Sequence, residues 1–405
     1  MRNRCNGIQL WAMPLPPSLA ENRALMLLWA ALPTARAVGG AVRDAVANYP
    51  ISDVDLAVPL PPDIVIQQLT AKGIRTIPTG IRHGTITALI HDSHFEITSL
   101  RQDVETNGRH AVIALTDDWH LDAKRRDFTI NAMSMDRNGR VFDYFGGLDD
   151  LAAGTIRFVG DAEQRIREDF LRILRYFRFF ARYGREKPDP AALRAIAANL
   201  DGIQDLSAER VWSEIKRILA ASDPSRAVEL MVRTNVLHRL LPECRTPDKF
   251  ARAIARGMPP DPLARFMALI DCPAEPIADR LHLSDKERKY CTAIRHAPDL
   301  PADATDAELR VALADHDRVA LVAKTYLAED DDDRTRLRAR LARASQPVFP
   351  LKGRDALALG AGPGPIIGAA LAAVRAWWLA HGCLPDIDAC RAHLKAELSR
   401  LDPTN

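Results

Sequence analysis

Cysteine is scarce in this 405-residue sequence, aromatic residues make up 6% of it, and the formal net charge is only +2. The cysteines show no Cys-x-x-Cys spacing, which argues against a zinc site and a disulfide framework and favours a reducing cytoplasm. Because the overall charge is so small, a nucleic-acid partner would have to bind a local basic surface. The cysteines are Cys5, Cys244, Cys272, Cys291, Cys383 and Cys390.

The apolar stretch from Ala24 to Leu32 is too short to cross a bilayer. The polar residues 21–23 precede it as a helix start would, so we expect a helix there and no membrane partner. The basic residues near the N-terminus give only a weak likeness to a targeting presequence, and Met13 is an alternative start of the chain.

Short β-branched runs in residues 36–58 and 74–100 predict strands of one mixed sheet, with helices 41–48 and 63–72 packed on it. A strand from Ile130 to Met135 and another from Arg140 to Tyr144 flank an Asn-Gly turn, which predicts a hairpin. After Asp161 the apolar spacing is mostly helical. We therefore expect an α/β domain followed by an all-α remainder, with boundaries near residues 155, 225 and 315.

Two aspartates after a Gly-Gly step are the most informative feature. Side chains at i and i+2 of a strand share a face, so Asp53 and Asp55 would present two carboxylates together. Hard oxygen ligands of this kind suit Mg²⁺, which also takes oxygens from a substrate's phosphates. The turn at Gly39 and Gly40 would start a helix whose free N–H groups favour a phosphate. The order of these parts favours nucleotidyl transfer over a solvated strand end.

Basic residues gather in two further segments. Arg125 and Arg126 stand before Asp127, and guanidinium groups match phosphate or ribose oxygens. A helix predicted from Arg165 to Tyr183 carries a stripe of arginines opposite an apolar face. Residues 157–185 hold eight arginines against four acids, an excess of four that gives a local basic surface. The stripe consists of Arg172, Arg175, Arg178 and Arg182.

Three other segments are less specific. Residues 100–122 contain Gly108 and polar side chains, which predicts a mobile loop or a simple surface loop. The acidic run 329–333 and the arginines after it are typical of a solvated charged helix. Residues 349–378 fit a turn, a capped helix and core tryptophans, as well as an RNA-gripping tail.

Taken together, the motifs resemble the class II tRNA nucleotidyltransferase and bacterial poly(A) polymerase family, and they occur in the family's order over residues 39–178. A weaker likeness continues through Ser207-Ala208-Glu209-Arg210 and Leu240-Leu241-Pro242-Glu243. The motifs are Gly39-Gly40-x-x-Arg43-Asp44 with Asp53-x-Asp55, Arg125-Arg126-Asp127-Phe128-Thr129-Ile130-Asn131-Ala132, Asp143-x-x-Gly146-Gly147-x-x-Asp150-Leu151, and Glu168-Asp169-x-x-Arg172-x-x-Arg175.

The resemblance implies a nucleotidyltransferase head of the polymerase β type in residues 1–155. It further implies a helical neck that selects the base (156–225), a helical body (226–315) and a helical tail that binds tRNA (316–405). The implied activity is template-independent addition of CCA to the 3′ end of tRNA from CTP and ATP, in the cytoplasm. Whether the chain is a monomer or a homodimer is left open.

The resemblance also assigns roles to residues. Asp53 and Asp55 would hold two Mg²⁺ ions, so that the primer's 3′-OH attacks the α-phosphate and pyrophosphate leaves. Supporting positions would be Glu96, Asp44 and Arg109, the last in the loop that full CCA synthesis requires. The positions that match nucleotide-binding residues of the family are Gly39, Gly40, Arg43, Arg125, Arg126, Asp127, Asp169, Arg172, Arg175 and Arg178.

In the family, the residues that match Asp169 and Arg172 select the base. Cytosine and adenine both place an exocyclic NH₂ donor beside a ring-nitrogen acceptor, which a carboxylate and a guanidinium read together. Uracil and guanine invert that order and would leave both charges badly paired. One pair of side chains thus accepts C and A and rejects U and G.

Several alternatives remain. A poly(A) polymerase or an A-adding enzyme shares the head and neck motifs, although Pro78 to Thr85 resembles the CCA-adding members. A His-Asp phosphohydrolase is suggested by His316-Asp317, but the other histidines are isolated. A catalytically dead RNA-binding scaffold is disfavoured because both metal carboxylates and the base-reading pair are present.

Overall fold

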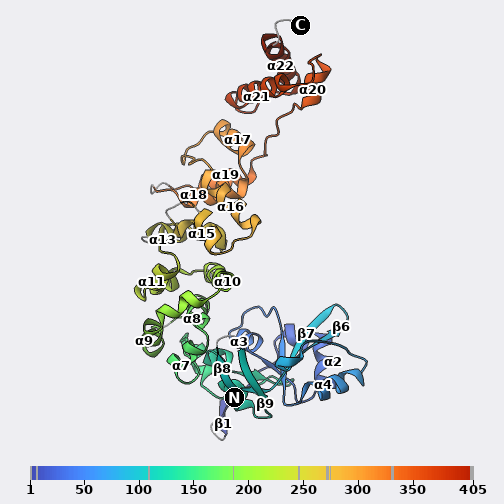
Figure 1. Ribbon diagram of the computed structural model, residues 1–405, viewed down its shortest axis with the longest axis vertical. Helices are drawn as coiled ribbons and strands as arrows, with labels where there is room; N and C mark the ends of the chain where they lie inside the picture. The colour runs from blue at the N-terminus through green and yellow to red at the C-terminus, as the bar shows by residue number, and fades with distance from the viewer. Residues whose placement is uncertain are drawn as a thin grey trace. The chain divides into compact units, whose positions relative to one another are not determined.

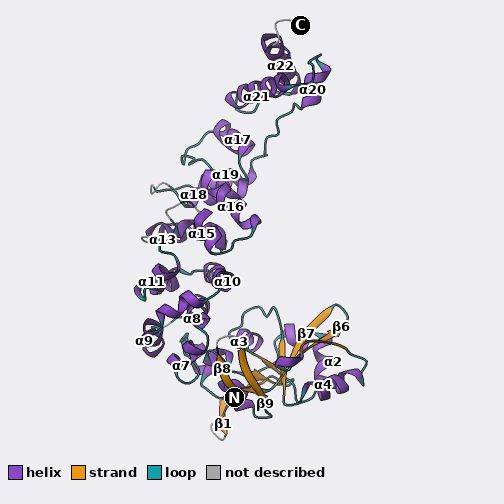
Figure 2. Ribbon diagram, viewed as in Figure 1, coloured by secondary structure: helices purple, strands orange, loops and turns teal. Residues whose placement is uncertain are grey.

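The structure is a computed structural model that describes residues 2–5, 8–107, 110–185, 187–244, 247–270, 273, 275–329 and 333–401. The chain forms two compact units that divide between Pro242 and Glu243, and each is described by itself (Figure 1). In the described residues, every strand lies in the first unit (Figure 2). No described helix is long and apolar enough to cross a membrane.

A nine-stranded mixed sheet organises the first unit, as the sequence predicts. Its order is β1-β2-β11-β10-β3-β4-β7-β6-β5, and all neighbours are antiparallel except β4 and β7. The strands are β1 (Arg2–Cys5), β2 (Ile8–Ala12), β3 (Arg36–Val38), β4 (Asp55–Val58), β5 (Arg75–Gly80), β6 (Thr85–Ile90), β7 (Ser93–Ser99), β10 (Ser134–Met135) and β11 (Arg140–Asp143).

Helices pack on this sheet because their apolar faces need cover. α4 contacts β5 and β6, while α3 contacts β3. Asn22 starts α2 at the predicted place, since its side chain accepts a hydrogen bond from the backbone N–H of Leu25. The helices of this part are α1 (Pro17–Ala20), α2 (Arg23–Ala31), α3 (Gly40–Val46), α4 (Pro62–Thr70), α5 (Trp119–Lys124) and α6 (Gly147–Ala153), with short 3₁₀ turns η1 (Ile81–His83) and η2 (Thr129–Asn131).

Helices α7 to α12 complete the first unit. An aromatic core joins them to the sheet region: Phe128 lies 4.7 Å from Phe158, and 5.2 Å from Phe179 of α8, between ring centroids. All three side chains are buried. The elements are α7 (Ala162–Glu168), α8 (Leu171–Tyr183), α9 (Pro190–Ala198), η3 (Leu200–Asp205), α10 (Ala208–Leu219), α11 (Ser225–Arg233) and α12 (Val236–Leu240).

The second unit is helical throughout its described residues. One buried cluster runs from Ala297 to Leu341, and another joins Leu351, Trp378 and Leu394. The helices are α13 (Asp248–Ala255), α14 (Pro262–Leu269), α15 (Glu275–Arg280), α16 (Asp285–His296), α17 (Asp306–Asp315), α18 (Arg318–Tyr326), α19 (Thr335–Arg343), α20 (Gly353–Ala358), α21 (Pro365–Ala380) and α22 (Ile387–Leu401).

The helix predicted from Arg165 to Tyr183 is in fact two helices. Asp169 has an extended backbone and ends α7, and its carboxylate accepts a hydrogen bond from the backbone N–H of Leu171 at 3.1 Å. Short polar side chains that bond nearby N–H groups compete with a continuous helix. The break places Asp169 at the beginning of α8, next to the arginines.

The predicted loop over residues 100–122 is instead largely a β-hairpin. β8 (Arg101–Asn107) pairs with β9 (His110–Leu115) in a separate two-stranded sheet, and α5 follows. The run of apolar and β-branched residues before Leu115 explains the strand. The predicted supporting residue Arg109 and its neighbour Gly108 lie outside the described residues.

The strand predicted from Ile130 is shorter than expected. Residues 129–131 form the turn η2, and only Ser134 and Met135 pair with β11, across the predicted Asn-Gly turn. The side-chain amide of Asn131 donates to the carboxylate of Asp127 at 3.0 Å. This hydrogen bond joins the two ends of residues 127–131, so the backbone there turns and does not continue as an extended strand.

Three features of the second unit bear on the remaining sequence predictions. Residues 330–332 of the acidic run lie outside the described residues. Of the arginines after it, Arg336 and Arg343 are exposed on α19 as predicted, whereas Arg334 is 5% exposed and donates to the carbonyl oxygen of Leu300. Asp317 accepts hydrogen bonds from the N–H groups of Val319 and Ala320 and thereby caps α18. Trp378 is buried in the core and Asp355 caps α20, as the structural interpretation of residues 349–378 predicts, whereas Trp377 is only partly buried.

Candidate nucleotide site

The sheet register places the Gly-Gly turn beside the aspartates. Val38, the last residue of β3, pairs with Asp55, the first residue of β4, so Gly39 comes directly after the residue that faces Asp55. Gly39 has φ +64°, and a Cβ there would lie 3.1 Å from a terminal nitrogen of Arg126. Both the backbone and the neighbouring guanidinium therefore require glycine at this position.

Asp53 does not lie in the strand that the sequence predicts for it, but two residues before the start of β4. Residues 51–54 have no regular structure, and β4 begins at Asp55. Both aspartates are exposed, as is Glu96 on the parallel neighbour β7, where Ile97 pairs with Leu56. The register therefore places Glu96, in the middle of β7, beside Asp55 at the start of β4.

The charges of these carboxylates interact. Loss of hydrating water to the surrounding protein raises the pKa of Asp55, the negative charges of Glu96 and Asp53 raise it further, and Arg126 opposes them. A divalent cation would relieve this repulsion, so the donor set suits a hard metal ion. Among the described residues no three acidic, histidine or cysteine side chains form a ligand group. The protein would thus supply two carboxylates and leave positions for water and phosphate oxygens.

A cavity of about 500 Å³ lies between these strands and α8. We call it the Asp55 cavity. It brings together most of the site residues predicted from the sequence, but Asp53, Asp44, Arg125 and Glu96 do not line it. Its lining residues are Gly39, Gly40, Arg43, Asp55, Arg126, Asp127, Asn131, Asp169, Leu171, Arg172, Arg175, Arg178, Phe179 and Arg210.

Arg125 and Arg126 are both tied to Asp122, which the sequence analysis did not single out. Asp122 is 2% exposed and binds Arg125 at 2.8 Å and Arg126 at 3.3 Å. Burial works to raise the pKa of Asp122, but the two guanidinium charges lower it overall. Asp122 thus holds Arg126 in the wall of the cavity, while Arg125 lies outside the set that lines it.

Asp127 joins the sheet region to α8. It accepts hydrogen bonds from the Nε of Arg175 at 2.7 Å and from the amide of Asn131 at 3.0 Å. Burial works to raise the pKa of Asp127, but the charge of Arg175 and these hydrogen bonds lower it overall. Arg43 donates in turn to the side-chain oxygen of Asn131 at 2.7 Å. Arg175, Asp127, Asn131 and Arg43 therefore form one continuous hydrogen-bond network.

Asp44 is a buried member of the same network. It accepts hydrogen bonds from Arg43 and from the hydroxyl of Tyr183 at the end of α8. Because its carboxylate is 9% exposed and already occupied, Asp44 positions Arg43 and does not face the cavity. The network thus contacts α8 at Arg175 and again at Tyr183.

The net positive charge around the arginine stripe is smaller than its local sequence indicates, because acids from other segments lie beside it. Each of its four members has a carboxylate partner, and three of these partners come from other segments of the chain. Burial, and after it the nearby charge of Arg175, lower the pKa of Arg178 to about 10 overall, although the charge of Glu214 opposes them. The partners are Glu168 for Arg172, Asp127 for Arg175, Glu214 for Arg178 and Asp44 for Arg182.

The predicted base-reading pair lies in the cavity wall, and each member is held by a neighbour. Arg172 donates to the carbonyl oxygen of Arg165 at 2.7 Å and pairs with Glu168. Asp169 accepts a hydrogen bond from Arg210 of α10 at 2.7 Å. The sequence indicates Arg210 only as part of a weak motif, because no local pattern connects it with Asp169, which is distant in the sequence.

Two domain families match this chain. The poly A polymerase head domain matches residues 35–157, and a domain described as a probable RNA and SrmB-binding site of polymerase A matches residues 187–246. The chain is 35% identical over 377 residues to human (Homo sapiens) mitochondrial CCA tRNA nucleotidyltransferase 1, covering 89% of this chain and 86% of that protein.

Bacterial proteins give the same result. The chain is 39% identical over 207 residues to the CCA-adding enzyme of Leuconostoc citreum, which is half of each chain. The structure matches that of the Bacillus stearothermophilus CCA-adding enzyme in complex with CTP with a TM-score of 0.75 at 26% identity, over 95% of this chain and 99% of that one. The chain therefore belongs to the tRNA nucleotidyltransferase and poly(A) polymerase family.

Proposed function

We propose that this nucleotidyltransferase adds CCA to the 3′ end of tRNA, using CTP and ATP. The observation that carries the proposal is the Asp55 cavity, which is lined by a carboxylate of the metal-binding type, the Asp169–Arg172 pair and five further arginines. Relatives named CCA tRNA nucleotidyltransferase, and a similar structure with CTP, support the choice of tRNA and nucleotides. The cytoplasm remains the predicted compartment.

The parts of the chain would divide the work. Residues 1–155 would form the catalytic head, 156–225 the neck that selects the base, 226–315 the body, and 316–405 the tail that binds tRNA. The head and neck assignments are supported by the placement of Asp55 and Asp169 on opposite segments around one cavity.

In the proposed reaction, the primer's 3′ oxygen bonds to the α-phosphorus and the bond from that phosphorus to the β-bridging oxygen breaks. Pyrophosphate leaves, and the hydroxyl proton is released to solvent. Asp53 and Asp55 would hold two Mg²⁺ ions, which when bound supply the charge that activates the hydroxyl and stabilises the triphosphate. Arg126, Arg175 and Arg178 would neutralise the triphosphate, and their clustering in one cavity supports this role.

Asp169 and Arg172 would read the base, and their neighbours explain how two flexible side chains hold a fixed geometry. Glu168 and the Arg165 carbonyl fix Arg172, while Arg210 fixes Asp169. The pair can then reject U and G by leaving desolvated charges without matching partners.

The first prediction concerns the product. Purified protein given a tRNA that lacks its 3′ end should add CC with CTP alone and CCA with both nucleotides, then stop. Sequencing of the products measures this. A run of A residues on many RNAs would identify a poly(A) polymerase instead, and addition of A alone to a tRNA that ends in CC would identify an A-adding enzyme.

The second prediction concerns the metal carboxylates. Asp53→Ala and Asp55→Ala should each lower the transfer rate at least about a hundredfold, because several kcal/mol of charge stabilisation would be lost. Binding of tRNA should not change. Asp63→Ala removes an exposed aspartate from α4 and serves as the matched control. Transfer at the normal rate by either of the first two variants would contradict the assigned role.

The third prediction concerns base choice. Asp169→Ala and Arg172→Ala should narrow the preference for CTP and ATP over UTP and GTP by about tenfold or more, since an unmatched buried polar group costs roughly 1–3 kcal/mol. Single-turnover rates with each nucleotide on one primer measure it. If the preference survives in both variants, another part of the cavity selects the base.

A further inference from the structure

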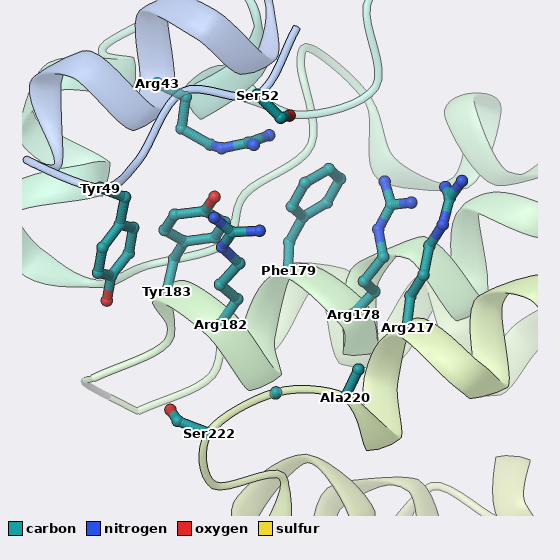
Figure 3. Close-up of a pocket in the computed structure, with 11 residues that line it drawn as sticks. Arg43, Tyr49, Ser52, Arg178, Phe179, Arg182, Tyr183, Arg217, Ala220 and Ser222 are labelled. Carbon is teal, nitrogen blue, oxygen red and sulfur yellow. The ribbon is translucent and has the colours of Figure 1, made fainter. Parts of the chain in front are cut away.

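A second cavity of about 600 Å³ adjoins the Asp55 cavity in the first unit (Figure 3). We call it the arginine cavity. It shares Arg43, Arg178 and Phe179 with the Asp55 cavity, and Ser52 at its edge directly precedes Asp53. Its remaining lining residues are Tyr49, Arg182, Tyr183, Arg217, Ala220, Ala221 and Ser222. The arginine cavity therefore borders the segment that carries Asp53, while Asp55 lines the adjoining cavity.

The arginine cavity carries an uncompensated positive charge. Four arginines line it, and its described lining contains no acid. Two buried carboxylates lie behind them: Glu214 is 3.0 Å from Arg178 and 3.7 Å from Arg217, while Asp44 binds Arg43 and lies 3.8 Å from Arg182. Two acids against four arginines leave an excess of two positive charges, and this favours an anionic ligand.

The two outer arginines are available to such a ligand. The side chains of Arg182 and Arg217 are 50% and 60% exposed, whereas Arg178 is 14% exposed. Their ion-pair distances of 3.8 and 3.7 Å are longer than those of a tight hydrogen-bonded pair. Figure 3 shows the side chains of Arg178 and Arg217 extending alongside one another from α8 and α10.

Aromatic rings alternate with these cations. Tyr49 is 37% exposed, and its ring centroid lies 5.5 Å from that of the buried Tyr183. The guanidinium carbon of Arg182 lies 5.5 Å from the Tyr49 ring. A basic groove with an accessible ring is the arrangement by which proteins bind single-stranded nucleic acid, with phosphates on the cations and a base stacked on the ring.

The proposed reaction needs two substrates at one pair of carboxylates. The Asp55 cavity holds the base-reading pair, so the incoming nucleotide belongs there and the acceptor requires a neighbouring site. We propose that the arginine cavity binds the single-stranded 3′ end of the RNA acceptor, with a base on Tyr49 and backbone phosphates on Arg182 and Arg217. This inference rests on the proposed function and names the acceptor site that it requires.

RNA binding without nucleotide tests the inference. The probes are one RNA hairpin with a blunt end and the same hairpin with a three-nucleotide 3′ extension. The double variant Arg182→Gln with Arg217→Gln should bind the extended hairpin about tenfold more weakly, and the blunt hairpin as the unsubstituted protein does. For the extended hairpin, a plot of the logarithm of the association constant against the logarithm of the salt concentration has a negative slope. The magnitude of that slope should decrease by about 1.4 in the double variant, or about 0.7 for each lost phosphate contact.

Two controls make the result specific. Arg233→Gln removes an exposed arginine of α11 that lines neither cavity, and it should leave both affinities unchanged. Tyr49→Leu should weaken binding of the extended hairpin at least about fivefold while Tyr49→Phe retains it, since a stacked base needs the ring and not the hydroxyl. Thermal unfolding verifies that each variant is folded.

The outcomes separate this inference from the proposed function. Equal losses for both hairpins, no loss for either, or a raised KM for CTP with unchanged RNA affinity would each overturn the acceptor site. The binding experiment involves no transfer, so loss of extension-dependent binding supports the acceptor site even if the unsubstituted protein makes a product other than CCA. That product would overturn only the proposed function.

Discussion

The pairing of Asp127 with Arg175 is the interaction on which the geometry of the site depends. Asp127 lies in the segment that follows α5, whereas Arg175 lies on α8. The carboxylate is buried, so its charge is tolerated only because Arg175 and Asn131 satisfy it. Removing either partner of such a pair leaves an uncompensated charge in a poorly hydrated place.

The network that starts at this pair contacts α8 at two levels. From Asp127 it runs through Asn131, Arg43 and Asp44 to the hydroxyl of Tyr183. Because Arg175 and Tyr183 are two turns apart on one helix, α8 is prevented from both sliding and tilting against the sheet region. The same helix carries Arg172 and Arg178, so the network fixes the distance between Arg172, which we propose reads the base, and Asp55.

Charge compensation explains how the protein folds with so many arginines around one cavity. Without a substrate, carboxylates from distant segments pair with the arginines and limit their mutual repulsion. Phosphate oxygens can take over the outward-facing donors of the same guanidinium groups, because each guanidinium has five N–H groups in a planar fork. The arginines thus stabilise the fold through these ion pairs, and the same groups would bind the anionic substrates of the proposed function.

The sequence predicts those parts of the site that local patterns determine. The mixed sheet, the hairpin at Gly139, the Gly-Gly turn and the grouping of Asp55 with Asp169 and the arginines around one cavity agree with the structure. Glu214 and Arg210 could not be predicted as partners, because each pairs with a residue far away in the sequence. Asp122 was missed although it lies three and four residues before Arg125 and Arg126, a helical spacing that could have indicated the pairing. The break at Asp169 was missed because the arginine spacing is helical on both sides of it; in the structure the Leu171 N–H donates to the Asp169 carboxylate at the break.

A double-mutant cycle on Asp127→Asn and Arg175→Gln in the full-length chain tests the central claim most directly. Chemical denaturation of each variant measures the free energy of unfolding of the first unit. The account predicts that the two substitutions are strongly non-additive, with a coupling energy of about 2 kcal/mol or more, because each alone leaves its partner unpaired. Additive effects would contradict it, since they would mean that α8 is held to the sheet region without this pair.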